Sequence, residues 1–78
     1  MGNGKRKEEL RQRLNGRTTS EVRALIDEVI FSERDRAMLK RSVIDDVTYE
    51  AIAEELDLSV TAVKKHVQCG RNVLIRYL

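Results

Sequence analysis

The sequence contains no proline and no tryptophan, and it has only one phenylalanine, two tyrosines and four glycines among its 78 residues. Without proline, no position forces a break in a helix. No stretch alternates β-branched or aromatic residues with polar ones, which is the pattern of a half-buried strand. These absences favour an all-α fold over one that contains a sheet.

Cysteine and long apolar runs are also scarce. Cys69 is the only cysteine, so an internal disulfide is excluded, and no second ligand stands at metal-binding spacing. The acidic residues between positions 45 and 57 lack the spacing and the central glycine of a calcium loop. No stretch approaches the ~20 apolar residues of a membrane span, and the first residues form no apolar signal core. We therefore expect a cytoplasmic protein without a metal ion or a cofactor.

The residue types of a catalytic site are missing as well. His66 is the only histidine, and no serine or cysteine nucleophile and no glycine-rich phosphate loop accompanies it. We therefore expect that the protein is not an enzyme and has no small-molecule substrate.

The net charge of +2 conceals a segregation of charge along the chain. Residues 1–17 carry six basic against two acidic residues, residues 45–57 carry six acidic residues and no base, and residues 58–78 carry four basic residues and no acid. A segment without acids that directly follows an acidic one is typical of proteins that bind polyanions.

The chain divides into a basic N-terminal arm, residues 1–17, and a helical domain, residues 18–78. Residues 8–14 of the arm have the apolar spacing of a short helix, and Gly16 is suited to end it. Isolated helices of this length are marginal in water. We therefore expect four helices, and a fifth if the arm folds.

Two helices are expected at the start of the helical domain. The first begins at Glu21 with Ser20 as its N-cap, and its apolar residues recur at intervals of three and four. The second has Ser32 as its N-cap and runs to about Val43.

Residues 48–68 have the pattern of a helix-turn-helix. Thr48 is the expected N-cap of a short helix and Ser59 that of a longer one, with Asp57 at the turn between them. Two helices joined by so short a turn cross steeply, which leaves the second free to enter a DNA major groove. The sequence thus predicts an all-α domain of four to five helices with a C-terminal helix-turn-helix.

The last helix, residues 60–78, would carry the side chains that read DNA. Steps of 100° per residue from an inward-facing Val63 place polar and basic side chains on the opposite face. Contacts with DNA bases are expected from Val60, Thr61, Ala62, Lys65 and Gln68. Contacts with DNA phosphates are expected from Arg41, Thr48, Lys64 and Arg71.

Simpler interpretations of the same residues stay open. A basic outer face is by itself the ordinary solvated side of a helix, so the DNA interpretation depends on the capped turn and the acid-free helix together. His66 either contacts DNA from the flank or packs beside its apolar neighbours. The C-terminal turns carry more apolar residues than one face needs, so they either pack against the helix that begins at Glu21 or form a homodimer. These residues are Val73, Leu74, Ile75, Tyr77 and Leu78.

From Ser32 onward the sequence resembles region 4 of bacterial sigma factors, especially the extracytoplasmic-function type. SERDRAML at 32–39 resembles the PERERRVL of that family, and TYEAIAEEL at 48–56 resembles its SYEEIAEIL. SVTAVKKHV at 59–67 is similar to SVGTVKSRL, and also to the TVKTHL of LuxR-type regulators.

The resemblance implies a bacterial or phage transcription regulator. Residues 60–68 would face promoter DNA, and residues 32–47 would dock on RNA polymerase. The chain leaves no room for the sigma region that melts promoter DNA, so we expect a free-standing region 4-like regulator or an excised domain. The alternative function is a protein-binding module that docks on RNA polymerase or another regulator without reading DNA itself.

Two positions depart from the family pattern. Asp57 stands where the turn prefers glycine, and aspartate tolerates the left-handed conformation that such a turn requires. Gly70 replaces a family alanine inside a helix, which costs about 1 kcal/mol unless close packing requires it.

Overall fold

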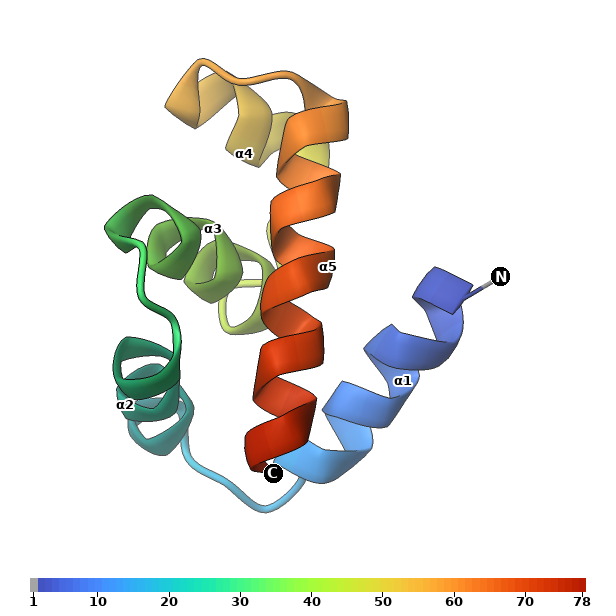
Figure 1. The fold of residues 1–78 in the computed structure, drawn as a ribbon, viewed down its shortest axis with the longest axis vertical. Helices are drawn as coiled ribbons and strands as arrows, with labels where there is room; N and C mark the ends of the chain where they lie inside the picture. Colours follow the sequence, from blue (N-terminus) through green and yellow to red (C-terminus); the bar gives the residue numbers. More distant parts are fainter. Residues whose placement is uncertain (1) are drawn as a thin grey trace.

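The computed structural model describes the backbone of residues 2–78 and the side chains of residues 8–78, and within this part the fold is all-α (Figure 1). The five helices are α1 (Gly2–Leu14), α2 (Thr19–Val29), α3 (Glu33–Val43), α4 (Tyr49–Leu56) and α5 (Val60–Tyr77). The all-α prediction and the helix-turn-helix at α4 and α5 are confirmed. None of these helices is long and apolar enough to cross a membrane.

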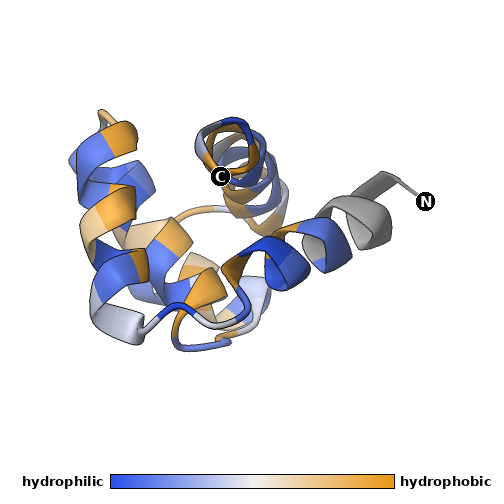
Figure 2. Cartoon of the chain, turned by 90° about the horizontal axis from the view of Figure 1, so that it is seen from below, coloured by the Kyte–Doolittle hydropathy of each residue, from blue (hydrophilic) through white to orange (hydrophobic). Residues whose placement is uncertain are grey.

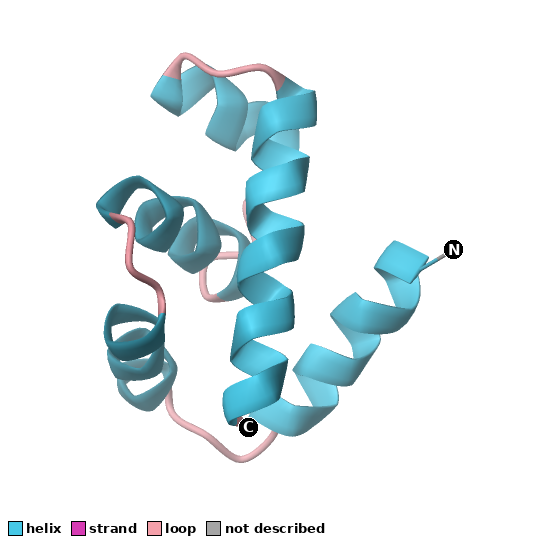
Figure 3. Cartoon of the chain, viewed as in Figure 1, coloured by secondary structure: helices cyan, strands magenta, loops and turns pink. Residues whose placement is uncertain are grey.

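The long C-terminal helix α5 is the centre of the fold, and each of the other four helices packs against it. Figure 3 shows that short loops join the helices. Figure 2 shows hydrophobic positions interspersed with hydrophilic ones along the coloured part of each helix, which is the pattern of helices that bury one face. One hydrophobic core joins all five helices. Its fully buried side chains are Ile26, Met38, Leu39, Ile52, Val63, Val67 and Leu74.

Three of the predicted N-caps are confirmed. The hydroxyls of Ser32, Thr48 and Ser59 each accept a hydrogen bond from the backbone N–H three residues later, at 3.4, 3.2 and 3.1 Å. Each bond satisfies one of the N–H groups that a helix leaves unpaired at its start.

The predicted N-cap of α2 is wrong, because Thr18 and not Ser20 caps this helix. The Thr18 hydroxyl accepts from the Glu21 N–H at 3.1 Å, and the Glu21 carboxylate accepts from the Thr18 N–H at 3.3 Å. This reciprocal capping box requires an acidic or amide residue three positions after the cap. Ser20 lacks one, since Arg23 occupies that position.

The basic arm folds into α1, which is longer than the predicted helix over residues 8–14. Gly16, with φ +88°, follows its end, as the sequence suggested. Leu10 is only 3% exposed and belongs to the common core. Packing on α5 therefore supplies the stability that an isolated helix of this length lacks.

The apolar C-terminal turns of α5 are largely covered within the monomer. Leu74 and Ile75 are buried in the same core as Val22 and Ile26 of α2, which is the packing alternative that the sequence left open. Tyr77, by contrast, is 66% exposed.

Candidate nucleic-acid interface

The turn between α4 and α5 is closed by a residue in the left-handed conformation. Asp57 has φ 56° and ψ 47°, and its backbone N–H points to the last carbonyls of α4. The Leu58 N–H donates to the Ala53 carbonyl at 2.9 Å, and the Asp57 N–H donates to the Glu54 carbonyl at 3.4 Å. These two carbonyls at the end of α4 therefore have hydrogen-bond partners although the helix stops. The expectation that aspartate supports this turn is confirmed, and Ser59 starts α5 directly after it.

Arg41 of α3 forms an ion pair with α4. Its guanidinium donates to both carboxylate oxygens of Glu55 in α4, with an Nε–Oε2 distance of 3.1 Å, and to Asp45 at 3.2 Å. The hydrogen bonds that Arg41 donates to Glu55, and then to Asp45, raise the pKa of Arg41, and the bond from Arg41 lowers the pKa of Glu55. Arg41 was expected to contact a DNA phosphate, but two carboxylates already offset its charge, so we withdraw that assignment.

The first two turns of α5 carry the exposed part of the expected reading surface. Thr61, Lys64 and Lys65 are exposed, and Val60 is 40% exposed although it is apolar. Neither lysine forms an ion pair with a described residue, so both charges face solvent. Two other expected base contacts, Ala62 and Gln68, are half-buried. Thr48 lies exposed at the start of α4, where its hydroxyl serves as the helix cap.

Arg71 does not lie on the reading surface, and its expected position is wrong. Its side chain is only 4% exposed. The guanidinium donates to the Ser42 hydroxyl at 3.2 Å and lies over the ring of Tyr49, 5.8 Å from the ring centre. Periodicity within α5 placed it on a solvated flank, but α1 and α3 both pack against α5 and cover that flank.

His66 bridges α5 and α3 and was not expected to do so. Its Nδ1 lies 3.0 Å from a carboxylate oxygen of Asp35, and the side chain is 47% exposed. It is therefore neither a buried packing residue nor unpartnered. Asp35 lies in the first turn of α3, and no spacing rule of the sequence links it to a residue of another helix.

Phe31 is the surface residue that sequence reasoning missed. This side chain is 98% exposed in the connector between α2 and α3. It lines a cavity of about 310 Å³ together with Val29, Ile30 and Val73, and with His66 and Cys69 at its polar side. A lone aromatic residue directly before the Ser32 cap was the available signal.

Metal-binding geometry is missing from the part of the chain whose side chains are described, because no three histidine, cysteine or acidic residues gather there. Cys69 is a free, exposed thiol.

Comparison with known proteins identifies the region that contains this interface. A family model described as sigma-70, region 4 matches residues 32–74, which include α3, α4 and most of α5. Helices α1 and α2 lie outside the match. No curated protein and no solved structure gives a significant match.

Proposed function

We propose, because this chain belongs to the sigma-70 region 4 family, that it is a sequence-specific regulator of transcription that reads the major groove of double-stranded DNA with α5. Membership of the family assigns a DNA-binding, transcription-related role. The observation that carries the finer proposal is the exposed, acid-free start of α5, which projects from a capped helix-turn-helix.

The proposed base contacts lie on the first turns of α5. The Lys65 ammonium would donate to guanine, and Thr61 would bond a base or touch a thymine methyl group. Val60 and Ala62 would add apolar contact, with Gln68 at the far edge of the surface, where its amide would pair with adenine. These side chains specify sequence because each base pair presents a distinct set of groups in the major groove.

The proposed phosphate contacts position α5 on the duplex. Lys64 is exposed beside Lys65, Thr48 is exposed at the start of α4, and α5 begins at Val60 directly after its Ser59 cap. Such contacts supply affinity that depends on salt and not on sequence. The exposed acids of α4, Glu50 and Glu54, would repel DNA from other orientations.

Selection of bound duplexes from a randomised DNA pool tests the proposal. The wild-type protein should enrich one motif, and Lys65→Glu should lose it. Arg23→Glu makes the same charge change at an exposed site on α2 and should retain the motif. A palindromic motif with half-sites about one DNA turn apart would indicate a homodimer, and a single half-site a monomer. If no motif is enriched, the proposal is wrong.

The apolar cavity beside Phe31 favours a second candidate function, in which the protein docks on RNA polymerase or another regulator without reading DNA. A fully exposed aromatic side chain next to a cavity is typical of protein-binding surfaces. Tight binding to core RNA polymerase that Phe31→Ser abolishes, together with no duplex affinity at low salt, would favour this function over DNA reading.

A further inference from the structure

We propose that the cavity between α1, α3 and α5 binds a small oxyanion, a phosphate group, with Arg71 and Arg11 as its cationic ligands. The first observation is the burial of a charge without a partner of opposite charge. Arg71 is the one charged residue that is buried among the described side chains, and it forms no salt bridge with a described carboxylate. A buried charge is costly unless it is paired, so this position calls for an anion.

Most of the hydrogen-bonding capacity of Arg71 is unused. A guanidinium carries five N–H donors, and the structure uses one of them, in the bond to Ser42. The contact with the Tyr49 ring occupies a face of the guanidinium and none of its N–H groups. Among the described side chains, every nitrogen atom that is closed off from solvent has a hydrogen-bond partner. The remaining N–H groups of Arg71 therefore reach the adjoining cavity.

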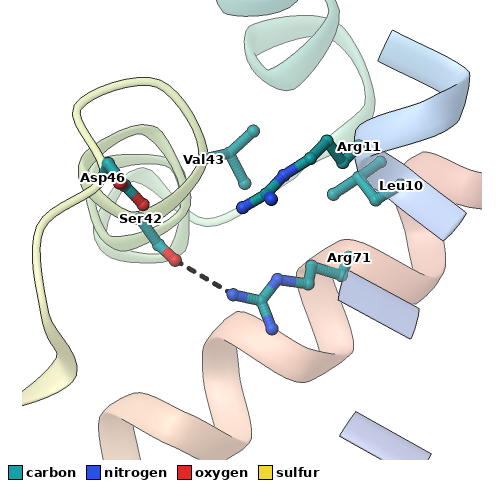
Figure 4. A pocket seen from close by; sticks show the side chains of 6 residues that line it. All are labelled: Leu10, Arg11, Ser42, Val43, Asp46 and Arg71. Atoms are coloured by element: carbon teal, nitrogen blue, oxygen red, sulfur yellow. Dashed lines mark hydrogen bonds between the residues drawn. The ribbon is translucent and has the colours of Figure 1, made fainter. Parts of the chain in front are cut away.

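This cavity has a volume of about 80 Å³, which is several times the ~10–15 Å³ of cavity volume that one water molecule requires. Figure 4 shows that Arg11 from α1 and Arg71 from α5 both extend into it, with Ser42 at the end of the dashed hydrogen bond. Because the Ser42 hydroxyl accepts from Arg71, its own proton is free to donate to a ligand. Two guanidinium forks and one hydroxyl match the several oxygens of a phosphate group.

Asp46 is the one carboxylate that lines the cavity. It offers a competing explanation, in which Asp46 itself, and not a bound anion, balances the charge of Arg71. It lies beside Ser42 at the rim and is exposed, with φ 57°. No ion pair joins Asp46 to Arg11 or to Arg71. Two positive charges therefore face one negative charge, and the excess is positive.

The test is a titration of the free protein with sodium phosphate, against sodium chloride at equal ionic strength, followed by NMR signals of the arginine side chains. Phosphate should shift the Nε–H signals of Arg11 and Arg71 saturably, and chloride should not. Arg11→Gln should weaken phosphate binding by about tenfold or more, since it removes charge-assisted hydrogen bonds to the anion. Arg17→Gln removes an equal charge from an exposed position after α1 and should leave the affinity unchanged.

Two results would overturn the site. One is an equal response to chloride and phosphate, and the other is an equal loss of affinity in Arg11→Gln and Arg17→Gln. Asp46→Asn separates the competing explanation. If the anion binds as proposed, this variant should bind phosphate more tightly. A less stable fold without tighter phosphate binding would instead make Asp46 the counter-ion of Arg71.

The phosphate group has two sources, a free anion or the DNA backbone, and a duplex distinguishes them. If added duplex displaces phosphate at constant ionic strength, the site takes a backbone phosphate. If phosphate binds the complex and the free protein equally, the site takes a free anion. Both outcomes support the site. The titration without DNA does not depend on the proposed reading of DNA by α5.

Discussion

Gly70 of α5 lies so close to Leu39 of α3 that a methyl group on Gly70 would come within 2.9 Å of Leu39 Cδ2. Glycine inside a helix costs about 1 kcal/mol relative to alanine. The close contact explains why it is tolerated, because both residues are buried where α3 and α5 meet.

Replacing this glycine should therefore destabilise the fold although alanine is the better helix former. In Gly70→Ala, Leu39 must move within a packed core, which costs ~1–3 kcal/mol, against a gain of about 1 kcal/mol in helix propensity. We expect a net loss of roughly 1 kcal/mol in urea unfolding. Leu39→Ala removes the clash at its own cost, so Gly70→Ala should be stabilising in that background. The same change in stability in both backgrounds would contradict the packing explanation.

Lys65 and Lys64 should differ in what they contribute to DNA binding. Lys65→Ala should reduce the preference for the cognate site by ~1–3 kcal/mol, since it removes a base contact. Lys64→Ala should weaken all duplexes alike and lower the dependence of log affinity on log salt by about 1. Binding titrations on cognate and scrambled duplexes at several salt concentrations measure both effects. Both side chains are exposed, so unfolding curves of the variants should match those of the wild type. Identical effects of the two changes would contradict the proposed docking.

The N-cap of α2 can be tested by two neighbouring substitutions. Thr18→Ala removes the hydroxyl that accepts from the Glu21 N–H, but it keeps the backbone N–H that donates to the Glu21 carboxylate, and it should destabilise the protein by about 1 kcal/mol. Ser20→Ala should change stability little, because its hydroxyl caps nothing and alanine favours the helix. Urea denaturation of the pair gives the comparison, and a larger loss for Ser20→Ala would restore the cap expected from the sequence.

The ion pair between Arg41 and Glu55 should make stability depend on pH in the acid range. The hydrogen bond from Arg41 lowers the pKa of Glu55 below its ordinary value of 4.5. The folded pKa is thus lower than the unfolded one, so the stabilisation is complete above about pH 4.5 and is lost as the pH falls through the folded value. The hydrogen bond from Lys40 likewise lowers the pKa of Asp27 below 3.8. The stabilisation from this pair is therefore also lost as the pH falls, at a lower pH.

In Glu55→Gln, the free energy of unfolding should therefore fall less steeply as the pH is lowered through the acid range. The effect is modest, because both side chains of the pair are more than a third exposed and solvent screens them. Urea midpoints between about pH 3 and pH 7 would show it. Glu54→Gln, on the same helix and without an ion pair to a described residue, is the matched control. Parallel curves for wild type and Glu55→Gln would exclude this role of the pair.

Much of the fold follows from short-range signals in the sequence. Ser32, Thr48 and Ser59 start their helices through bonds to residues three positions away, and Asp57 closes its turn through its own backbone conformation. Such interactions involve neighbours in the chain, so residue type and spacing suffice to predict them. The error at Ser20 arose within the same range, because the capping box at Thr18 had gone unrecognised.

The site was less predictable, because its decisive contacts join residues far apart in the chain. Helical periodicity correctly turned Lys64 and Lys65 outward, since it depends only on the geometry of α5. The same rule misplaced Arg71, because it does not register which neighbouring helix covers a flank. The pairing of Arg41 with Glu55 likewise depends on how α3 and α4 cross.

The sequence by itself thus determined the helices α2 to α5, the N-caps of α3, α4 and α5, the helix-turn-helix and the charge of its second helix, because these depend on spacing and local hydrogen bonds. Tertiary structure alone decided that α1 docks on α5 and that Arg71 lies buried beside Ser42 and Arg11. The physical reason is that burial is a property of the assembled helices. A charged side chain on one helix is exposed or enclosed according to the partners that pack around it.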